Sequence, residues 1–243
     1  MKKSLHSQLS FSLGETKSSF AKAKEDKQKK LRWLSHTGIE WINTCPKCFW
    51  LRTNKKIYQP QGIVSRLSNR FDIVIKDYFN GYRKKGKLPP MIDGKIKGKL
   101  EDPFQEKYFH KVDNEYGFWG KLDECIVDGD FYIPVDFKTT SSDPNEKEIM
   151  EAYQHQIDEY VYLMEENKKK TPHYGYLLFF YPEFHEEVHN GFPMAITLKK
   201  VEAHPERVLP RIQRAIEILK SPMPESSPDC EYCNWFKKIE EYY

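Results

Sequence analysis

Hydrophobic residues follow two different periodicities along this chain. Over 65–82 the apolar positions recur every three to four residues, which predicts an amphipathic helix that packs on a sheet. Residues 116–127 and 130–139 are instead rich in aromatic and branched side chains, as β-strands are. Asp128-Gly129 between them suits the positive φ angles of a tight turn. The pattern predicts a helix followed by a β-hairpin.

The alternation of helices and strands continues to the end of the chain. The further predicted elements are a short helix that begins at Ser35, a helix over 145–168, strands over 174–181 and 194–201, and a last helix over 206–220. A chain of 243 residues suffices for one sizeable core, so we expect a single α/β domain over 33–243. Residues 1–32, polar and dense in Lys and Glu, are predicted to form a flexible leader.

Composition excludes several classes of protein. Hydrophobic residues at 39% and charged residues at 31% are typical of a soluble globular protein rather than a disordered one. The apolar stretches fall short of the ~18 residues of a membrane-spanning helix, and no signal-peptide core follows the first charges. We therefore expect a cytoplasmic protein without a membrane partner.

Net charge says little about nucleic-acid binding. The formal charge of +3 is common among enzymes of many kinds. Arg66 and Arg70 lie one helical turn apart on the predicted helix over 65–82 and are candidates for contacts to phosphate groups. An ordinary solvated surface explains the same residues equally well.

The predicted hairpin gathers charged residues on one face. With a two-residue turn at 128–129, Pro134 comes opposite Asp123, and strand alternation places Asp136 and Lys138 on that same face. The two carboxylates become diagonal neighbours, roughly 7–8 Å apart at the backbone, so both can reach one hard cation such as Mg²⁺ or Mn²⁺. The opposite face carries an apolar row formed by Phe131, Ile133, Val135 and Phe137.

A solvent-facing strand is the plain alternative for such a pattern. Asp136 and Lys138 alone would fit it, because exposed strand faces often carry Asp and Lys. The neighbouring residues favour chemistry instead, since Gly120 precedes Lys121-Leu122-Asp123 and a helix with Gln156 and Tyr160 follows.

Three segments carry a resemblance to a known family: Gly-Lys-Leu-Asp over 120–123, Val-Asp-Phe-Lys-Thr over 135–139 and Gln-Ile-Asp-Glu-Tyr over 156–160. In this order they make the chain, over about 36–240, resemble the PD-(D/E)XK nuclease superfamily and, within it, the RecB-like and CRISPR-associated four-cysteine exonuclease branch. The resemblance implies a restriction-endonuclease-like core with a central mixed sheet flanked by helices. It also implies a Mg²⁺- or Mn²⁺-dependent DNA nuclease.

The resemblance implies a role for each matching residue. Asp123 and Asp136 would hold the metal ion, and Lys138 would position or activate the attacking water. A purely electrostatic role for the lysine is equally consistent. Gln156 and Tyr160, one helical turn apart, would support the site and contact DNA, and packing with hydrogen bonding alone is the competing interpretation.

One position departs from the family pattern. RecB-like members usually carry a histidine ligand on the first helix, where this chain has Asp72. Asp72 shares a helical stripe with Ser68 and Ile75, so we expect it to point inward and to act as a third metal ligand. A salt bridge to Lys76, one turn further on, is the alternative. His110 is the second candidate for the additional ligand.

Four cysteines form two Cys-x-x-Cys pairs near the two ends of the chain. Cys45 with Cys48 and Cys230 with Cys233 have the spacing of a four-thiolate metal site, and a cytosolic chain is not expected to form disulfides. Such a centre would join the N- and C-terminal segments. Cys125 has no partner spacing and is predicted to pack as a small apolar residue.

The identity of the cysteine-bound metal stays open between two candidates. The resemblance implies a [4Fe-4S] cluster, as in four-cysteine nucleases. Those proteins commonly take one cysteine from the N-terminal side and three from the C-terminal side, whereas this chain supplies two and two. Zn²⁺ is therefore the alternative.

The leading functional hypothesis is a DNA nuclease that acts on single strands or on DNA ends. The first alternative is a catalytically silent nucleic-acid-binding subunit of a repair or CRISPR-adaptation complex, which would bind DNA with steep salt dependence and no cleavage. The second is a zinc-bound scaffold that recruits protein partners through its C-terminal aromatic residues, Trp235, Phe236, Tyr242 and Tyr243.

Overall fold

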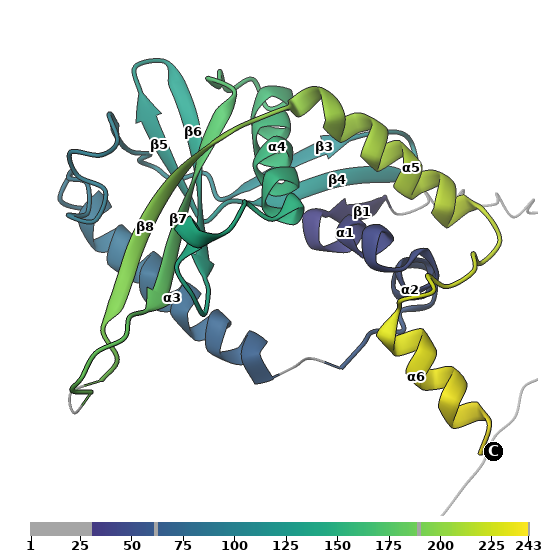
Figure 1. Cartoon of the computed structure of the whole chain (residues 1–243). Coiled ribbons are helices and arrows are strands. Elements are labelled where there is room, and N and C mark those ends of the chain that lie inside the picture. The colour runs from purple at the N-terminus through teal and green to yellow at the C-terminus, as the bar shows by residue number, and fades with distance from the viewer. Residues whose placement is uncertain (1–30, 61–62, 189–190, 243) are drawn as a thin grey trace, which may run out of the picture. The chain divides into compact units, whose positions relative to one another are not determined.

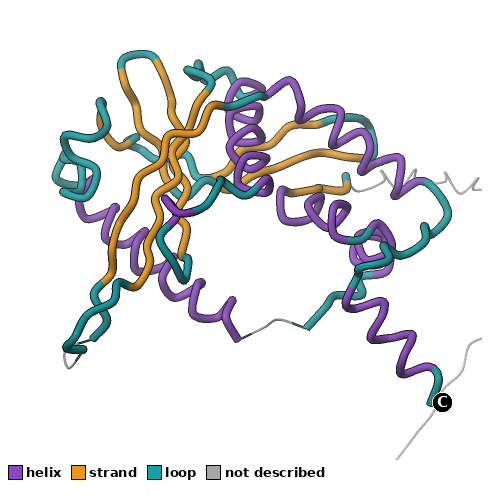
Figure 2. Tube along the Cα trace, in the orientation of Figure 1, coloured by secondary structure: helices purple, strands orange, loops and turns teal. Residues whose placement is uncertain are grey.

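Helices and strands alternate along the chain and form a mixed α/β fold (Figures 1 and 2). The computed structural model describes residues 31–60, 63–188 and 191–242, so the predicted leader over 1–32 lies outside the described residues except at its end. The helices are α1 (His36–Thr44), α2 (Pro46–Trp50), α3 (Ile63–Arg83), α4 (Glu151–Glu166), α5 (Val208–Lys220) and α6 (Glu231–Glu240). Within the described ranges, none of them is long and apolar enough to cross a membrane.

The strands form two mixed sheets rather than one. They are β1 (Arg32–Ser35), β2 (Lys99–Leu100), β3 (Lys107–Lys111), β4 (Tyr116–Lys121), β5 (Glu124–Asp128), β6 (Phe131–Thr139), β7 (Tyr174–Pro182) and β8 (Met194–Glu202). One sheet has the order β1-β4-β3, and the other has the order β2-β5-β6-β7-β8 with β6 and β7 parallel. The predicted fold of mixed sheet and flanking helices is confirmed, with a second sheet added.

The predicted continuous strand over 116–127 is wrong. The chain changes sheets at Leu122 and Asp123, so that β4 pairs with β3 whereas β5 pairs with β2 and β6. The backbone N–H of Leu122 still donates to the carbonyl of Glu106 on the β3 side, and the Leu122 side chain is fully buried. A run of apolar residues does not reveal such a change of partner, because both halves are buried.

The hairpin turn lies one residue later than predicted. Asp128 pairs with Phe131, so the two turn residues are Gly129 and Asp130, and Gly129 adopts the positive φ of 58°. The register therefore slips by two residues, so that Glu124 pairs with Val135, and Asp123, one residue before the ladder, comes beside Asp136 rather than opposite Pro134. A slip of two keeps every side chain on its predicted face, because side chains alternate with a period of two.

Both faces of the five-stranded sheet are covered by helices. The predicted apolar row of β6 packs on α3, where the rings of Phe137 and Phe79 lie 4.7 Å apart. On the other face, α4 packs Ile157 against the buried Leu177 and Phe179 of β7. The charged face of the hairpin is consequently an interior surface under α4 rather than a solvent-facing one.

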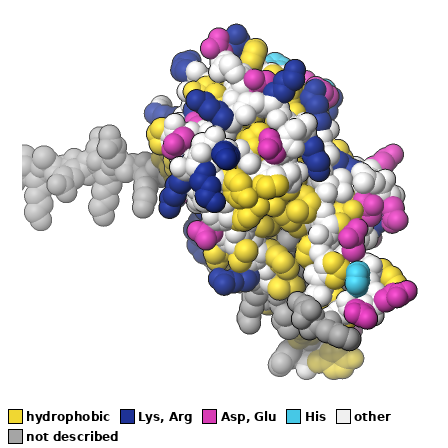
Figure 3. Space-filling view, turned by 90° about the vertical axis from the view of Figure 1, so that its left-hand side faces the viewer, with side chains coloured by type: hydrophobic (Ala, Val, Ile, Leu, Met, Phe, Trp, Pro, Cys, Tyr) yellow, Lys and Arg dark blue, Asp and Glu magenta, His cyan; other side chains and the backbone are white. Residues whose placement is uncertain are grey.

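The five-stranded sheet ends at the edge strand β8, and α3 lies on the same side of the molecule in Figure 1. Viewed from that side, hydrophobic side chains gather in one area of the surface (Figure 3). A pocket of about 640 Å³ lies there between α3 and the ends of the strands, with Leu67, Phe71, Phe180 and Met194 among its lining residues.

A buried ion pair fastens the C-terminal end of α3 to β5. Arg83 Nη2 lies 2.7 Å from Oε2 of Glu124, whose side chain is 1% exposed. Burial raises the pKa of Glu124, and the guanidinium of Arg83 partly offsets that effect. Because Glu124 directly follows Asp123, this ion pair also fixes the place where the chain enters β5.

We expect Arg83→Met to lower the free energy of unfolding by about 3–5 kcal/mol, because it leaves a buried carboxylate unpaired. Urea denaturation measures the loss. Lys200→Met is the matched control, since it removes an exposed ion pair with Glu202 at 3.1 Å and should cost no more than about 1 kcal/mol. Equal losses in the two variants would contradict the structural role of Arg83.

Candidate active site and cysteine centre

The three charged residues of the hairpin meet beneath α4. Asp136 and Lys138 lie on β6, and the Lys138 ammonium contacts the Asp136 carboxylate, which is 1% exposed. Asp123 lies at the entry to β5, where its Oδ2 accepts a hydrogen bond of 2.9 Å from the backbone N–H of Phe137. The structure therefore brings Asp123, Asp136 and Lys138 together, as the sequence predicted.

The neighbouring carboxylates of Asp123 and Asp136 place unfavourable negative charge close together in a buried site. Burial, followed by the charge of Asp136, raises the pKa of Asp123 to about 6. Within the described part of the chain, Oδ2 of Asp136 is buried and contacts the Lys138 ammonium, whereas Oδ1 faces the Tyr160 hydroxyl. Two buried carboxylates side by side repel each other, so the pair offers the hard oxygen ligands that Mg²⁺ and Mn²⁺ prefer. The donor set fits a divalent cation.

Gln156 connects the lysine to the tyrosine on α4. Its Oε1 accepts a hydrogen bond of 2.6 Å from the Lys138 ammonium, and its Nε2 donates to the Tyr160 hydroxyl at 2.7 Å. The ammonium also lies 4.7 Å from the centre of the Tyr153 ring. These contacts hold the ammonium of Lys138 at one position. Gln156 therefore positions the lysine in addition to packing on its neighbours.

Tyr160 stays a neutral donor inside the site. Its hydroxyl lies 2.9 Å from the carbonyl oxygen of Lys121 and 3.2 Å from Oδ1 of Asp136. Burial raises the pKa of Tyr160 well above its usual value, and the charges of Asp136 and Asp123 raise it further. The phenol therefore keeps its proton.

Gly120 explains how α4 comes so close to β4. A Cβ atom at this position would lie 2.7 Å from Cδ1 of Leu163 and 3.5 Å from the Tyr160 ring. A side chain here would therefore push on the helix that carries Gln156 and Tyr160. The glycine that precedes Asp123 in the sequence has a packing reason.

Lys76 is a residue of the site that the sequence did not assign to it. Its ammonium lies 2.8 Å from Asp72 and 2.7 Å from Oδ1 of Asp123, so it bridges α3 and the entry to β5. Burial opposes the charge of Lys76, but Asp123 and Asp72 outweigh burial and raise its pKa. The position of Lys76 one turn after Asp72, on the inward side of α3, is the signal that could have found it.

The two candidates for an additional ligand have other partners in this structure. Asp72 forms the predicted alternative, the ion pair with Lys76, and its side chain is 41% exposed. His110 lies on β3 in the three-stranded sheet, where its Nδ1 is 2.8 Å from Glu166. The contact between Lys76 and Asp123 leaves Asp72 near the carboxylate pair, whereas His110 belongs to a different sheet.

Of the two arginines predicted to contact phosphate, the structure describes the side chain of one. Arg70 is exposed on α3, two residues before Asp72. The side chain of Arg66 lies outside the described residues. Both positions therefore stay predictions.

The four paired cysteines converge at one point. Cys48 Sγ lies 3.7 Å from the sulfurs of Cys230 and Cys233, and Cys45 Sγ lies 3.9 Å from Cys233. All four sulfurs lie within 4.8 Å of one another, so they form a possible metal site that joins α2 to α6. The predicted meeting of the two pairs is confirmed, and Cys125 is buried in the main core as expected.

The backbone around Cys45 favours its thiolate. Burial opposes ionisation of Cys45, but backbone groups of Cys48 and Ser227 outweigh it and lower the pKa of Cys45 to about 7. Burial instead raises the pKa of Cys48. A thiol such as Cys48 would lose its proton on binding a metal ion.

A second charged cluster lies on the far side of α4. His36, Glu40 and Glu159 offer ligand atoms within 4.8 Å of one another. Arg211 from α5 contacts both carboxylates, including Oε1 of the buried Glu159 at 2.7 Å. Since the chain supplies its own cation here, we interpret the cluster as a brace between α1, α4 and α5.

Comparisons with known proteins agree with this geometry. A model of the PD-(D/E)XK nuclease superfamily matches residues 65–237, a stretch that contains the hairpin residues, α4 and the second cysteine pair. The crystal structure of SSO0001 is similar in fold, with a TM-score of 0.51 and 15% sequence identity over 85% of this chain and 84% of that chain. The comparison with curated proteins gives no match.

We expect Cys233→Ser to loosen α6, because the cysteine cluster links this helix to α2. Its midpoint of thermal unfolding should fall by several degrees, and limited proteolysis should cut within Glu231–Glu240. Tyr242→Ala, which changes an 86% exposed side chain just past α6, is the control and should resist the protease as the unchanged protein does. Equal resistance of the two variants would show that the cysteines do not hold the helix.

Proposed function

This chain belongs to the PD-(D/E)XK nuclease superfamily, and we propose that it is a metal-dependent DNA nuclease that acts on single strands or DNA ends. The observation that carries the proposal is the buried group of Asp123, Asp136 and Lys138, with Gln156 and Tyr160 fixed against it. A merely solvent-exposed strand would not place these side chains beneath a helix.

Asp123 and Asp136 would hold the divalent cation. Their fit rests on the burial of two neighbouring carboxylates, which raises the pKa of Asp123. When bound, Mg²⁺ or Mn²⁺ would neutralise charge on the phosphate and make a bound water more acidic. Because the Lys76 ammonium already contacts Asp123, the cation would have to compete with it.

Lys138 would act on the reacting phosphodiester. Its ammonium contacts Asp136 and is fixed by Gln156, so it is available at one place to orient the attacking water or to stabilise the negative charge that develops on the phosphate. Tyr160 would act through Asp136, because its neutral hydroxyl lies 3.2 Å from Oδ1 of that carboxylate. We regard Gln156 and Tyr160 as positioning residues.

Asp72 remains our candidate for a third ligand. Its carboxylate and that of Asp123 both contact the Lys76 ammonium, so the two acids face one cation in this structure. A metal ion that displaced the ammonium would find the same two carboxylates. The structure equally supports a salt-bridge role for Asp72.

The converging cysteine pairs support membership of the RecB-like, four-cysteine branch. Membership would imply that the substrate is a free DNA end or a single strand. It would also suit a protein that works with partners in repair or CRISPR adaptation. Arg66 and Arg70 on the first half of α3 would contact phosphate groups of the strand.

We expect Asp136→Asn and Lys138→Ala each to lower cleavage of end-labelled single-stranded and duplex DNA at least about a hundredfold in Mg²⁺ or Mn²⁺. Gel analysis of the products gives both the rate and the preference between strands. Lys200→Ala is the control, because its exposed ammonium contacts Glu202 and the ring of Tyr174 rather than the hairpin site and should leave the rate unchanged.

Two results would contradict the nuclease assignment. Cleavage that survives Asp136→Asn would place the activity outside the hairpin site. A folded, metal-loaded protein that binds DNA without cutting DNA or RNA would instead favour the silent nucleic-acid-binding subunit. A fold-preserving check by thermal unfolding accompanies each variant.

The sulfur spacing supports zinc over an iron–sulfur cluster. Four thiolates on one tetrahedral Zn²⁺ with Zn–S bonds of 2.3 Å lie about 3.8 Å apart. Three of the sulfur separations are 3.7–3.9 Å, and all four sulfurs lie within 4.8 Å of one another, which is close to that arrangement. Thiolates of a [4Fe-4S] cluster bind four different irons, each displaced outward from the cluster centre, so their sulfurs must lie wider apart. We therefore propose zinc, although the family resemblance favoured the cluster.

Anaerobically purified protein should contain about one zinc per chain and no visible absorption band, as expected for a d¹⁰ ion in a four-thiolate site. Elemental analysis measures zinc and iron together, and Cys48→Ser should lose the metal whereas Cys125→Ala should keep it. Iron with matching acid-labile sulfide, accompanied by a brown colour that Cys48→Ser abolishes, would replace zinc by the cluster.

A further inference from the structure

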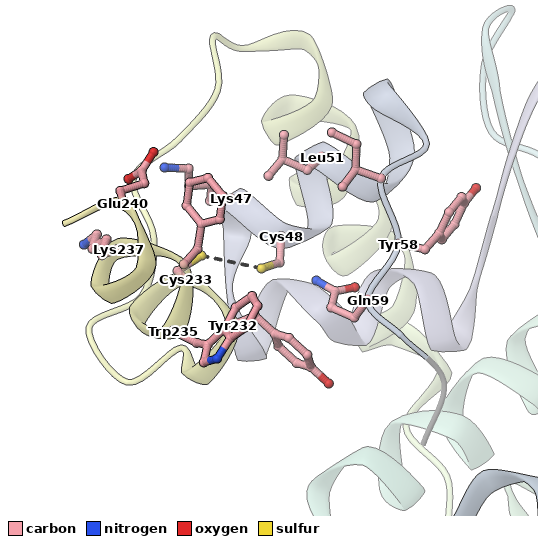
Figure 4. Close-up of a pocket in the computed structure, with 12 residues that line it drawn as sticks. Lys47, Cys48, Leu51, Tyr58, Gln59, Tyr232, Cys233, Trp235, Lys237 and Glu240 are labelled. Carbon is pink, nitrogen blue, oxygen red and sulfur yellow. Dashed lines mark hydrogen bonds between the residues drawn. The ribbon is translucent and has the colours of Figure 1, made fainter. Parts of the chain in front are cut away.

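A groove of about 430 Å³ opens beside the cysteine centre, between α6 and the segment that follows α2 (Figure 4). Tyr232 and Trp235 approach it from α6, and Tyr58 and Gln59 approach it from the other side, with Cys48 and Cys233 between them. Its size falls in the range of roughly 300–1,000 Å³ that suits small planar groups. The groove is lined mainly by aromatic and aliphatic side chains.

The aromatic residues of α6 are exposed to an unusual degree. No residue of α6 is buried, and the side chains of Trp235 and Phe236 are 65% and 56% exposed. Across the groove, Tyr58 is 60% exposed. Large apolar groups gathered on a surface mark a binding site more often than they occur by chance.

The charges around the groove are complementary to a polyanion. Residues 46–60 contain no acidic residue and carry four basic ones, which are Lys47, Arg52, Lys55 and Lys56. On α6, two lysines, Lys237 and Lys238, balance two glutamates, so the positive excess comes from the α2 side. Lys47, Lys237 and Glu240 line the groove itself. An uncharged protein helix would not need this excess.

Arg52 holds one wall of the groove in place. Its guanidinium lies 5.1 Å from the centre of the Tyr58 ring and 4.6 Å from that of Trp41. It also donates a hydrogen bond of 2.6 Å to Oε1 of Gln59. The exposed tyrosine is therefore fixed rather than free, which reduces the entropy that stacking on it would cost.

The chain leads from the groove into α3, the helix that carries Asp72. The segment that contains Tyr58 and Gln59 leads into α3, and Asp72 lies nine residues, about 14 Å, along that helix. Arg66 and Arg70 belong to the same stretch. Successive nucleotides rise about 3.4 Å in a stacked strand, so a strand of several nucleotides would cover this length of α3.

We infer that the groove beside the cysteine centre is a second, sequence-tolerant binding site for single-stranded nucleic acid, in which bases stack on Trp235 and Tyr58 while the flanking lysines contact phosphate. Aromatic rings beside a basic track are the arrangement that such sites use. The choice of polymer rests on the proposed nuclease function.

The test measures binding with catalysis switched off. A fluorescein-labelled oligothymidylate is titrated in buffer without Mg²⁺, Mn²⁺ or chelator with the Asp136→Asn protein, with and without Trp235→Ala, and fluorescence anisotropy reports the affinity. Trp235→Ala should weaken binding roughly fivefold or more, Trp235→Phe should restore most of it, and binding should fall steeply with salt. Phe184→Ala, which removes an aromatic side chain that is 95% exposed on a different loop, should change nothing.

Each other outcome overturns the inference in a recognisable way. Unchanged affinity in Trp235→Ala, or an equal loss in Phe184→Ala, removes the stacking site while cleavage by the unchanged protein still upholds the nuclease. Equal binding of an abasic strand shows that phosphate alone is recognised. Concentration-dependent self-association that Trp235→Ala abolishes would make the groove a protein interface. Tight, Trp235-dependent binding without any cleavage would uphold the groove and refute the nuclease.

Discussion

The antiparallel pairing of β5 with β6 is the interaction on which the rest of the candidate site depends. Two strands joined by a two-residue turn cannot slide without breaking that turn, so the pairing brings Asp123, one residue before the ladder, beside Asp136. α4 then covers their face, and Gly120 leaves room for the Leu163 side chain of that helix. The reach of Gln156 and Tyr160 to the charged groups follows from this close approach. One register and one missing side chain thus determine the geometry of the site.

α4 contacts charged side chains on two of its sides. Tyr160 faces the carboxylate of Asp136, and its neighbour Glu159 faces Arg211 and His36 in the brace with α1 and α5. Buried charges are stabilising only in good geometry with their partners, and they cost several kcal/mol when a partner is lost. The helix is therefore held in rotation as well as in position. This precision is what a site that must place an ammonium and a phenol requires.

Sequence periodicity predicted the long elements well and the short ones poorly. The helix over 65–82 was found because burial of one side imposes a regular spacing, whereas β2, with two residues, leaves no pattern to detect. The turn was placed one residue early because Asp128-Gly129 and Gly129-Asp130 both supply a glycine, and only the strand pairing distinguishes them. The contact of Lys76 with Asp123 depends on how α3 lies against β5, which no local pattern encodes. The cysteines were predicted correctly because their spacing itself is the signal.

The ammonium of Lys76 gives the acidic pair a cation that is part of the chain. The carboxylates of Asp72 and Asp123 are therefore neutralised as soon as α3 packs, and the centre can form during folding with no ion present. In the proposed function the four cysteines would differ, because binding of a metal ion would remove the thiol protons and couple that centre to folding. The chain would thus have two kinds of metal dependence. One ion would be exchangeable and would switch reactivity on and off with its supply, and the other would be a permanent component of the architecture.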